Sequence, residues 1–275
     1  MTHSNKKIDQ EVRNYGGSEY GLVNANAEPN SKRLLLSDLR GGDYAHAGDV
    51  EAIDLVLDKI LKINPKVKSG NVLDVGCGFG GTLEYLRNQG FTNLYGVDIN
   101  AESINYAKTK YQNIHFDLLD ALEIESFYPK EKFDLVIMFN SIYAITDKKK
   151  LLESLAKISK KDAILVVFDY SSPKQNKALP ILDFSGKKML PIELKSFSTD
   201  LKETNWHLIE AKDLSNEFIT WYSKFIDRLR NKKNYLEQNF SKNDINQVES
   251  SFSYFLNQLK NKNMEGVVIY ATKYK

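Results

Sequence analysis

Four glycines stand within positions 76–81, directly after a short apolar run, Asn71 to Val75, that Asp74 interrupts. Glycine is needed where a backbone adopts positive φ or lies directly against a ligand, so this density predicts a loop that cradles a ligand. The run before the loop predicts a strand, and residues 82–86 predict the opening of a helix. The free amide groups at that helix start favour an anionic part of the ligand.

The glycine loop admits two cofactors. Gly76, Gly78 and Gly81 satisfy the dinucleotide fingerprint G-x-G-x-x-G. Asp74 followed by Gly76, Gly78 and Gly80 satisfies the acid-x-G-x-G-x-G loop of S-adenosylmethionine (SAM) enzymes.

Two further acids follow predicted strands. Asp98 ends the apolar run 94–99, where a carboxylate can accept both hydroxyl hydrogens of a ribose. NAD and SAM folds share that acid, so Asp98 does not discriminate between them. Asp120 follows the third predicted strand, where an acid can meet an adenine amino group. Asp120 and Asp74 therefore favour SAM.

Composition indicates an ordinary globular protein. The chain has 275 residues, 42% of them hydrophobic, which is enough for one large domain with an elaboration. A net charge of +2 provides no field that would attract a nucleic acid. The single cysteine, Cys77, the polar N-terminus and the lack of a run of roughly 20 apolar residues predict a soluble cytoplasmic protein without a membrane segment. The histidines and the cysteine show no metal-ligand spacing, so we expect no metal.

The order of apolar runs predicts an α/β fold. Strands near 71–75, 94–99, 114–116, 133–139 and 163–168 alternate with helices, including 50–63, which Asp49 is expected to cap, and 148–159. Runs that are apolar on both faces predict a mostly parallel sheet covered on both sides. Ligands then bind where the strands end.

The pattern changes beyond residue 170. We expect a helix near 192–204, a strand near 206–211, two amphipathic segments at 217–238 and 243–260, and a final strand at 266–272 inserted beside the previous one. The predicted organisation is an N-terminal arm or lid over 1–48, a cofactor-binding core over 49–212, a helical insertion over 213–263 and a final core strand over 264–275.

These motifs, in this order, resemble those of the class I SAM-dependent methyltransferases. The resemblance covers residues 71–170 and rests on four segments: 74–80, 96–99, 120–122 and 133–137. It implies a Rossmann-like sheet with a terminal antiparallel strand, SAM as cofactor and S-adenosyl-L-homocysteine (SAH) as product. The cofactor-binding residues that it implies are Asp74, Gly76, Cys77, Gly78, Gly80, Asp98, Ile99, Asp120, Ala121, Asn140 and Ala45.

Outside the core, the chain is similar to small-molecule N-methyltransferases of the sarcosine/dimethylglycine and phosphoethanolamine kind. Residues 41–48 and the insertion from 213 to 266 carry this similarity, which places Ala45 and His46 against the cofactor. Phosphoethanolamine enzymes resemble one another in an Arg and a His after the fourth strand, whereas residues 140–144 here contain neither. That difference disfavours phosphoethanolamine itself. The absence of a Pro-Pro-aromatic sequence at the same place disfavours base methylation.

Methyl transfer from a sulfonium chiefly requires alignment of nucleophile, methyl group and sulfur. An amine must also lose a proton, and a cationic amine binds well against aromatic faces. We predict His46 and Tyr143 as catalytic candidates. The substrate-contact candidates are Tyr20, Tyr44, Tyr222 and Arg228.

The predicted function is SAM-dependent methylation of a small metabolite, most readily an amine. Two alternatives stay open: a SAM-binding sensor or scaffold without turnover, and a nicotinamide-dependent oxidoreductase that uses the same glycines. Composition and motifs give no prediction of oligomeric state.

Overall fold

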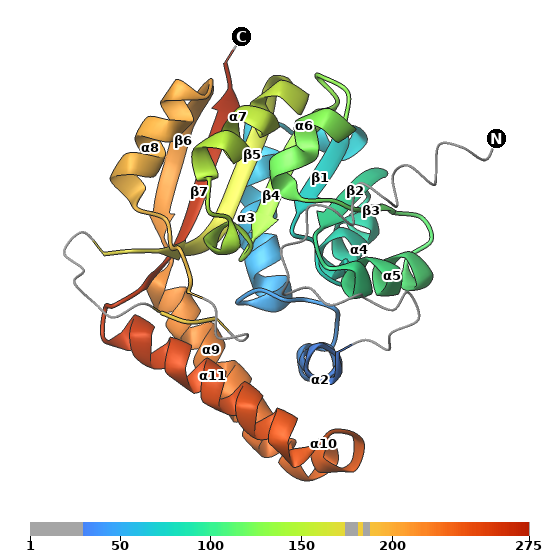
Figure 1. Cartoon of the computed structure of the whole chain (residues 1–275), viewed down its shortest axis with the longest axis vertical. Helices are drawn as coiled ribbons and strands as arrows, with labels where there is room; N and C mark the ends of the chain where they lie inside the picture. The colour runs from blue at the N-terminus through green and yellow to red at the C-terminus, as the bar shows by residue number, and fades with distance from the viewer. Residues whose placement is uncertain (1–29, 174–180, 184–187, 275) are drawn as a thin grey trace, which may run out of the picture.

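A seven-stranded sheet forms the centre of the computed structural model, which describes residues 30–173, 181–183 and 188–274 (Figure 1). The strand order is β3-β2-β1-β4-β5-β7-β6. The strands are β1 (Asn71–Val75), β2 (Asn93–Asp98), β3 (His115–Leu118), β4 (Phe133–Phe139), β5 (Ser159–Ser171), β6 (Trp206–Asp213) and β7 (Glu265–Lys273). The first five are mutually parallel, and β7 runs antiparallel between β5 and β6. This arrangement confirms the predicted, mostly parallel sheet and the position of the last strand beside the previous one, β6.

Helices cover both faces of the sheet. One apolar core contains residues of α3 (Asp49–Ile63), α4 (Gly81–Asn88) and α5 (Ala101–Lys110). The other contains residues of α6 (Ile124–Phe127), α7 (Lys148–Ile158) and α8 (Leu194–Glu203). Three 3₁₀ turns complete the core: η1 (Val67–Ser69), η2 (Ala121–Glu123) and η3 (Ile142–Ala144). Strands with helices on both sides have no solvent-exposed face, which is why their sequences are continuously apolar.

The segment between β6 and β7 forms a separate helical layer. It consists of α9 (Ser215–Asn231), α10 (Lys233–Asn239) and α11 (Lys242–Lys260), with α9 packed along α11. In Figure 1 the carboxyl ends of the parallel strands point down toward this layer. None of the described helices is long and apolar enough to cross a membrane.

The helix α2 (Ser31–Arg40) differs from the sequence prediction, which treated residues 1–48 as an arm outside the core. Leu35 and Leu39 are fully buried, and α2 packs against α9 and α11. The capping prediction for Asp49 was also wrong. Asp49 is the first residue of α3, whose N-cap position is Gly48 with a φ of 81°. The Asp49 carboxylate pairs with Arg40 instead.

Strand β1 carries a buried carboxyl group inside the sheet. Asp74 is 2% exposed within β1, where Gly96 of β2 and Ile137 of β4 are its register partners. Burial, followed by the neighbouring charge of Asp98, raises the pKa of Asp74 to about 8. Asp74 is therefore mostly protonated in the folded protein at pH 7.

The loop between β1 and α4 is held by close packing. Gly80 has a φ of 85°, and a Cβ atom there would lie 2.6 Å from the Phe116 ring. Gly90 has a φ of 90°, but a Cβ atom added to it would meet no other atom within 4 Å. The two glycines thus share the same backbone strain and differ in available space.

We predict that Gly80→Ala destabilises the protein more than Gly90→Ala. Left-handed backbone costs either alanine about 1–2 kcal/mol, and overpacking against Phe116 adds about 1–3 kcal/mol at position 80 only. Urea denaturation of both variants measures the difference. Equal losses of unfolding free energy in the two variants would show that the Phe116 ring moves aside for the added Cβ atom without a loss of stability.

We also predict that Asp74 makes stability depend on pH. Its pKa is raised on folding, so its contribution is complete below about pH 4, the unfolded value, and is lost as pH rises toward 8. Between pH 5 and 8 the unfolding free energy should fall more in the wild type than in Asp74→Asn, by on the order of 1–3 kcal/mol. Urea denaturation at both pH values tests this. Parallel pH profiles for the two proteins would contradict it.

Candidate active site

Gly76, Gly78 and Gly80 all adopt left-handed backbone, with φ of 81°, 54° and 85°. The amides of Gly76 and Cys77 donate to the Val97 carbonyl of β2 at 2.8 and 3.0 Å. A Cβ atom at Gly76 would collide with the Ser141 side chain. At Gly78 a Cβ atom would meet its nearest neighbours, Arg33 and Ala45, at 3.5 and 3.9 Å, which are ordinary van der Waals contacts.

Asp98 joins the glycine loop to the end of β2. Its Oδ2 accepts a hydrogen bond from the Gly78 amide at 2.8 Å, and its Oδ1 accepts one from the Asn100 amide at 2.8 Å. The carboxylate remains partly exposed, so it keeps lone pairs for a ligand. Loop and carboxylate thus meet at one point, and their contacts with a cofactor stay a prediction.

Apolar side chains lie open beside Asp98. Ile99 is 59% exposed and Leu118, the register partner of Asp98 in β3, is 48% exposed. The Leu119 amide donates to the Asp98 carbonyl at 3.0 Å, which ties the two strand ends together. Asp120 is exposed and caps η2 by accepting from the Leu122 amide at 2.9 Å, with Ala121 next to it. These residues form an open wall with apolar and acidic parts.

Asn140 follows β4 in left-handed backbone, with a φ of 47°. Its Oδ1 accepts from the Ala47 amide at 2.9 Å, and this contact fixes the orientation of the carboxamide. Its Nδ2 is buried without a hydrogen-bond partner among the described residues. Buried donors normally have partners, so this amide group is available to a ligand.

Residues 42–48 cover the loop from the N-terminal side. Asp43, 4% exposed, accepts from Tyr111 at 2.5 Å and pairs with Lys110 at 2.7 Å, which fixes the segment against α5. The exposed Ala45 has its Cβ atom 3.9 Å from the Cβ position of Gly78. Ala45 therefore lies beside the glycine loop, and its contact with a cofactor stays a prediction.

His46 is 3% exposed and its two ring nitrogens are both engaged. Nδ1 lies 3.0 Å from the Ala47 carbonyl, and Nε2 lies 3.2 Å from the Thr82 hydroxyl. Burial lowers the pKa of His46 to about 4, so the ring is neutral at pH 7. The carbonyl requires a proton on Nδ1, and Nε2 then accepts from Thr82. Both ring nitrogens of His46 are thus used in packing and hydrogen bonding, and the catalytic role predicted for it stays a prediction.

Tyr143 stands in η3, directly after β4, and is partly exposed. Its ring packs edge-on against Tyr170 of β5, with 5.7 Å between centroids. The Tyr170 hydroxyl in turn bonds to that of Tyr222 on α9. Tyr143, Tyr170 and Tyr222 together form what we call the aromatic wall. Tyr222 is 3% exposed, so it supports this wall from behind and does not face the open site.

Asp169 positions Tyr143. This fully buried carboxylate accepts from the amides of Ile142, Tyr143 and Tyr170 at 2.9, 3.3 and 2.7 Å. Burial raises the pKa of Asp169 to about 7, although these three hydrogen bonds oppose the shift. Sequence reasoning missed both Asp169 and Tyr170. Their signal was that two polar residues interrupt the end of an apolar run.

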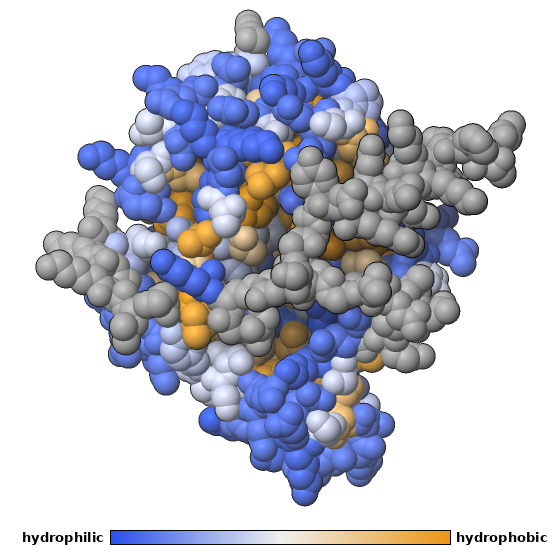
Figure 2. Space-filling model, viewed as in Figure 1, coloured by the Kyte–Doolittle hydropathy of each residue, from blue (hydrophilic) through white to orange (hydrophobic). Residues whose placement is uncertain are grey.

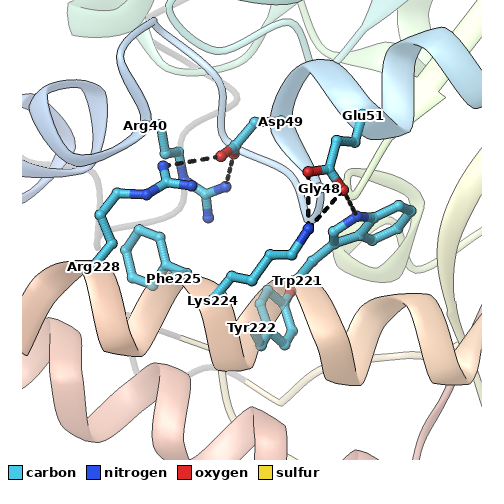
Figure 3. Close-up of a pocket in the computed structure, with 9 residues that line it drawn as sticks. All are labelled: Arg40, Gly48, Asp49, Glu51, Trp221, Tyr222, Lys224, Phe225 and Arg228. Atoms are coloured by element: carbon cyan, nitrogen blue, oxygen red, sulfur yellow. Dashed lines mark hydrogen bonds and ion pairs between the residues drawn. The ribbon is translucent and has the colours of Figure 1, made fainter.

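Arg228, predicted as a substrate anchor, is committed to structural contacts (Figure 3). It donates to the Leu39 carbonyl at 2.8 Å and lies 3.4 Å from Asp49, which also pairs with Arg40. Figure 3 shows both guanidinium groups turned toward the Asp49 carboxylate. The anchor expectation therefore differs from the geometry, which uses Arg228 to join α9 to α2 and α3.

The remaining candidates have different positions. Tyr44 is half-buried, with its ring 5.9 Å from that of His46. Cys77 is 8% exposed, and burial raises its thiol pKa well above the usual value, so it is no nucleophile. Tyr20 lies outside the described residues.

Figure 2 shows hydrophobic residues gathered across the middle of one face, between hydrophilic upper and lower parts. This band lies at the level where the parallel strands end in Figure 1. A ligand site at the carboxyl ends of parallel strands is the rule for open α/β sheets.

The known sequences similar to this chain include phosphoethanolamine N-methyltransferases. Phosphoethanolamine N-methyltransferase 1 of Arabidopsis thaliana is 22% identical over 213 residues, which are 76% of this chain and 42% of the relative. Phosphoethanolamine N-methyltransferase of Plasmodium falciparum is 26% identical over 243 residues, 85% of this chain and 88% of the relative. The chain thus spans less than half of the plant relative.

Solved structures share the fold. Haemonchus contortus phosphoethanolamine N-methyltransferase 2, in complex with phosphomonomethylethanolamine and S-adenosylhomocysteine, has a TM-score of 0.76 at 18% identity, over 89% of this chain and 58% of that one. A putative sarcosine dimethylglycine methyltransferase from Galdieria sulphuraria has a TM-score of 0.74 at 13% identity, over 89% and 99%.

A family model described as a methyltransferase domain matches residues 66–218, more than half of the chain. The match begins before β1 and extends into α9, so it includes the glycine loop, Asp98, Asp120 and Asn140. The fold agrees with this match and confirms the class predicted from the motifs. The chain belongs to the methyltransferase domain family.

Proposed function

We propose that this protein is a SAM-dependent methyltransferase that methylates the nitrogen of a small amine metabolite. The observation that carries the proposal is the meeting of the Gly78 amide and the Asp98 carboxylate beside an open apolar wall. Family membership and the N-methyltransferase relatives support it.

The residues present fit the cofactor. Three left-handed glycines form a cradle that Cβ atoms would obstruct or strain, and Asn140 brings an unpartnered buried amide to its rim. Asp98 would accept from the ribose hydroxyls, with Ile99 against the adenine ring. Asp120 and Ala121 would lie at the adenine edge. Gly76, Gly78, Asn140 and Ala45 would surround the methionine part, and Asp74 would support the loop from below.

SAM supplies a methyl group bound to a sulfonium, and the group that leaves is the neutral thioether of SAH. Because this is a good leaving group, the transfer needs no metal ion or protein nucleophile. The protein's task is then to hold the acceptor nitrogen in line with the methyl–sulfur bond. Asn140 and the glycine loop would fix the cofactor end of that line, and Tyr143 the acceptor end. The acceptor nitrogen must be unprotonated when it attacks, and the methylated product carries the positive charge.

Tyr143 is the best candidate for contact with the amine. Burial raises the pKa of its hydroxyl, so the ring stays a neutral phenol at physiological pH and presents an electron-rich face to a cation. Asn140 and Ala144 occupy a stretch without the Arg and His expected for phosphoethanolamine. We therefore propose an amine acceptor other than phosphoethanolamine.

The nicotinamide alternative conflicts with the strand order. Dinucleotide-binding Rossmann sheets have the order 3-2-1-4-5-6, whereas here the antiparallel β7 lies between β5 and β6.

The sensor or scaffold alternative shares the cofactor site and differs only in turnover. Transfer of a labelled methyl group from SAM into a panel of primary and secondary amines, phosphoethanolamine included, separates it from an enzyme.

We predict that the purified protein binds SAM and SAH and does not bind NADH. Asp98→Ala should weaken SAH binding about 10- to 100-fold, because a charge-assisted pair of hydrogen bonds is lost. Isothermal titration measures both variants, with Asp58→Ala on the exposed face of α3 as the matched control. No SAH binding by the wild type, or NADH binding in its place, would refute the proposed function.

We further predict that the ring of Tyr143, not its hydroxyl, contributes to acceptor binding. Tyr143→Leu should raise KM for the amine by about 2- to 30-fold, the range of a cation–π contact. Tyr143→Phe should stay close to wild type, and KM for SAM should not change in either variant. Steady-state kinetics with the best acceptor of the panel measures these values. A marked loss of kcat in Tyr143→Phe would assign the hydroxyl a role in proton transfer instead.

A further inference from the structure

Arg33 of α2 lies over the glycine loop. Its Nη1 is 3.5 Å from the position of a Cβ atom at Gly78, and its guanidinium carbon is 5.6 Å from the centre of the Phe79 ring. Phe79 itself stacks on Tyr106 of α5, at 4.1 Å between centroids. A cation is thus held beside Gly78, the loop glycine at which an added Cβ atom would meet no close contact among the described residues.

This guanidinium has no hydrogen-bonded or ion-paired partner within residues 30–173, 181–183 and 188–274. The two neighbouring arginines, Arg40 of α2 and Arg228 of α9, share the Asp49 carboxylate. Neither of the acids nearest the loop, Asp98 and Asp74, pairs with the Arg33 guanidinium. Asp98 accepts from the Gly78 and Asn100 amides, and burial keeps Asp74 mostly protonated at pH 7 by raising its pKa to about 8.

The charge of Arg33 acts inside the site. Burial raises the pKa of both the Cys77 thiol and the Tyr143 hydroxyl, and the positive charge of Arg33 opposes the shift in each case. Cys77 follows β1 and Tyr143 lies in η3 after β4, so the guanidinium lies near the carboxyl ends of these two strands.

The helix that carries Arg33 is firmly anchored. Leu35 and Leu39 are buried, the Ser31 hydroxyl donates to Asp244 of α11 at 2.7 Å, and Tyr235 of α10 donates to Asp38 at 3.2 Å. Arg228 of α9 adds the bond to the Leu39 carbonyl. Arg33 therefore starts from a rigid backbone, and little freedom is lost when it binds a ligand.

We propose that Arg33 is a cofactor-binding residue that pairs with the α-carboxylate at the amino-acid end of SAM. This inference rests on the proposed function, which places the methionine part at Gly78. The carboxylate is the single anionic group of that part, and a guanidinium can bind it through two parallel hydrogen bonds. The helix α2 thereby couples the helical insertion to cofactor binding.

The test compares SAH with decarboxylated SAH, which lacks the carboxylate and keeps the amine. Isothermal titration uses the full chain as wild type, Arg33→Gln, Arg33→Lys and the control Lys32→Gln on the same helix. Arg33→Gln should weaken SAH binding about 10- to 100-fold and change binding of the decarboxylated probe by less than about threefold. Arg33→Lys should retain part of the affinity, and Lys32→Gln all of it.

Two outcomes overturn the assignment of Arg33: unchanged SAH affinity in Arg33→Gln, or an equal loss toward SAH and the decarboxylated probe. Circular dichroism and the thermal midpoint show whether each variant is folded, and Arg33→Lys keeps the test decisive if the Gln variant unfolds. A wild type that binds neither ligand refutes the proposed function itself. A wild type that binds SAH with no dependence on Arg33 refutes only this inference.

Discussion

The hydrogen bond from the Gly78 amide to the Asp98 carboxylate unites the two parts of the candidate site. The backbone is left-handed at Gly78 and at Gly76 and Gly80 on either side of it, a conformation that glycine adopts at little steric cost. The hydrogen bond requires β1 and β2 to end at the same level, and the amides of Gly76 and Cys77 secure this by sharing the Val97 carbonyl. The position of every other site residue follows from the edge that these contacts define.

Residues 30–48 lie over the glycine loop, and their position depends on that edge and on the helical insertion together. Asp43 fixes them to α5, and Asn140 fixes them to the end of β4 through the Ala47 amide. Arg40 reaches the His46 carbonyl at 2.6 Å while pairing with Asp49, which Arg228 also approaches. Asp49 therefore has a structural role that its place at the start of α3 did not suggest.

Much of the fold could be predicted because each core strand carries a continuous apolar run. The cofactor edge could be predicted because glycines and acids at strand ends have few other uses. The helix α2 could not, since its four leucines stand in a polar segment, and the two that are buried, Leu35 and Leu39, belong to a helix that packs against the distant α9 and α11. The engagement of Arg228 was hidden for the same reason, because its partners belong to α2 and α3.

The histidine prediction shows a different limit. Position predicted correctly that His46 lies beside the glycine loop, but the chemistry of a histidine depends on which groups its nitrogens meet. Thr82 and the Ala47 carbonyl take both nitrogens, and the rings of Phe139 and Phe168 help to exclude water, so the pKa falls. No local pattern in the sequence encodes that environment.

Two cations of α9 are engaged in structural contacts. Arg228 joins helices, and the exposed Lys224 pairs with Glu51, which also accepts from the Trp221 indole at 2.8 Å. What the insertion contributes to the site is the buried Tyr222, acting through Tyr170 on the wall that Tyr143 completes. Asp169 fixes this wall from beneath through three backbone amides. Under the proposed function, the aromatic wall of Tyr143, Tyr170 and Tyr222 binds the acceptor by shape and by cation–π attraction, which suits an amine better than a phosphate.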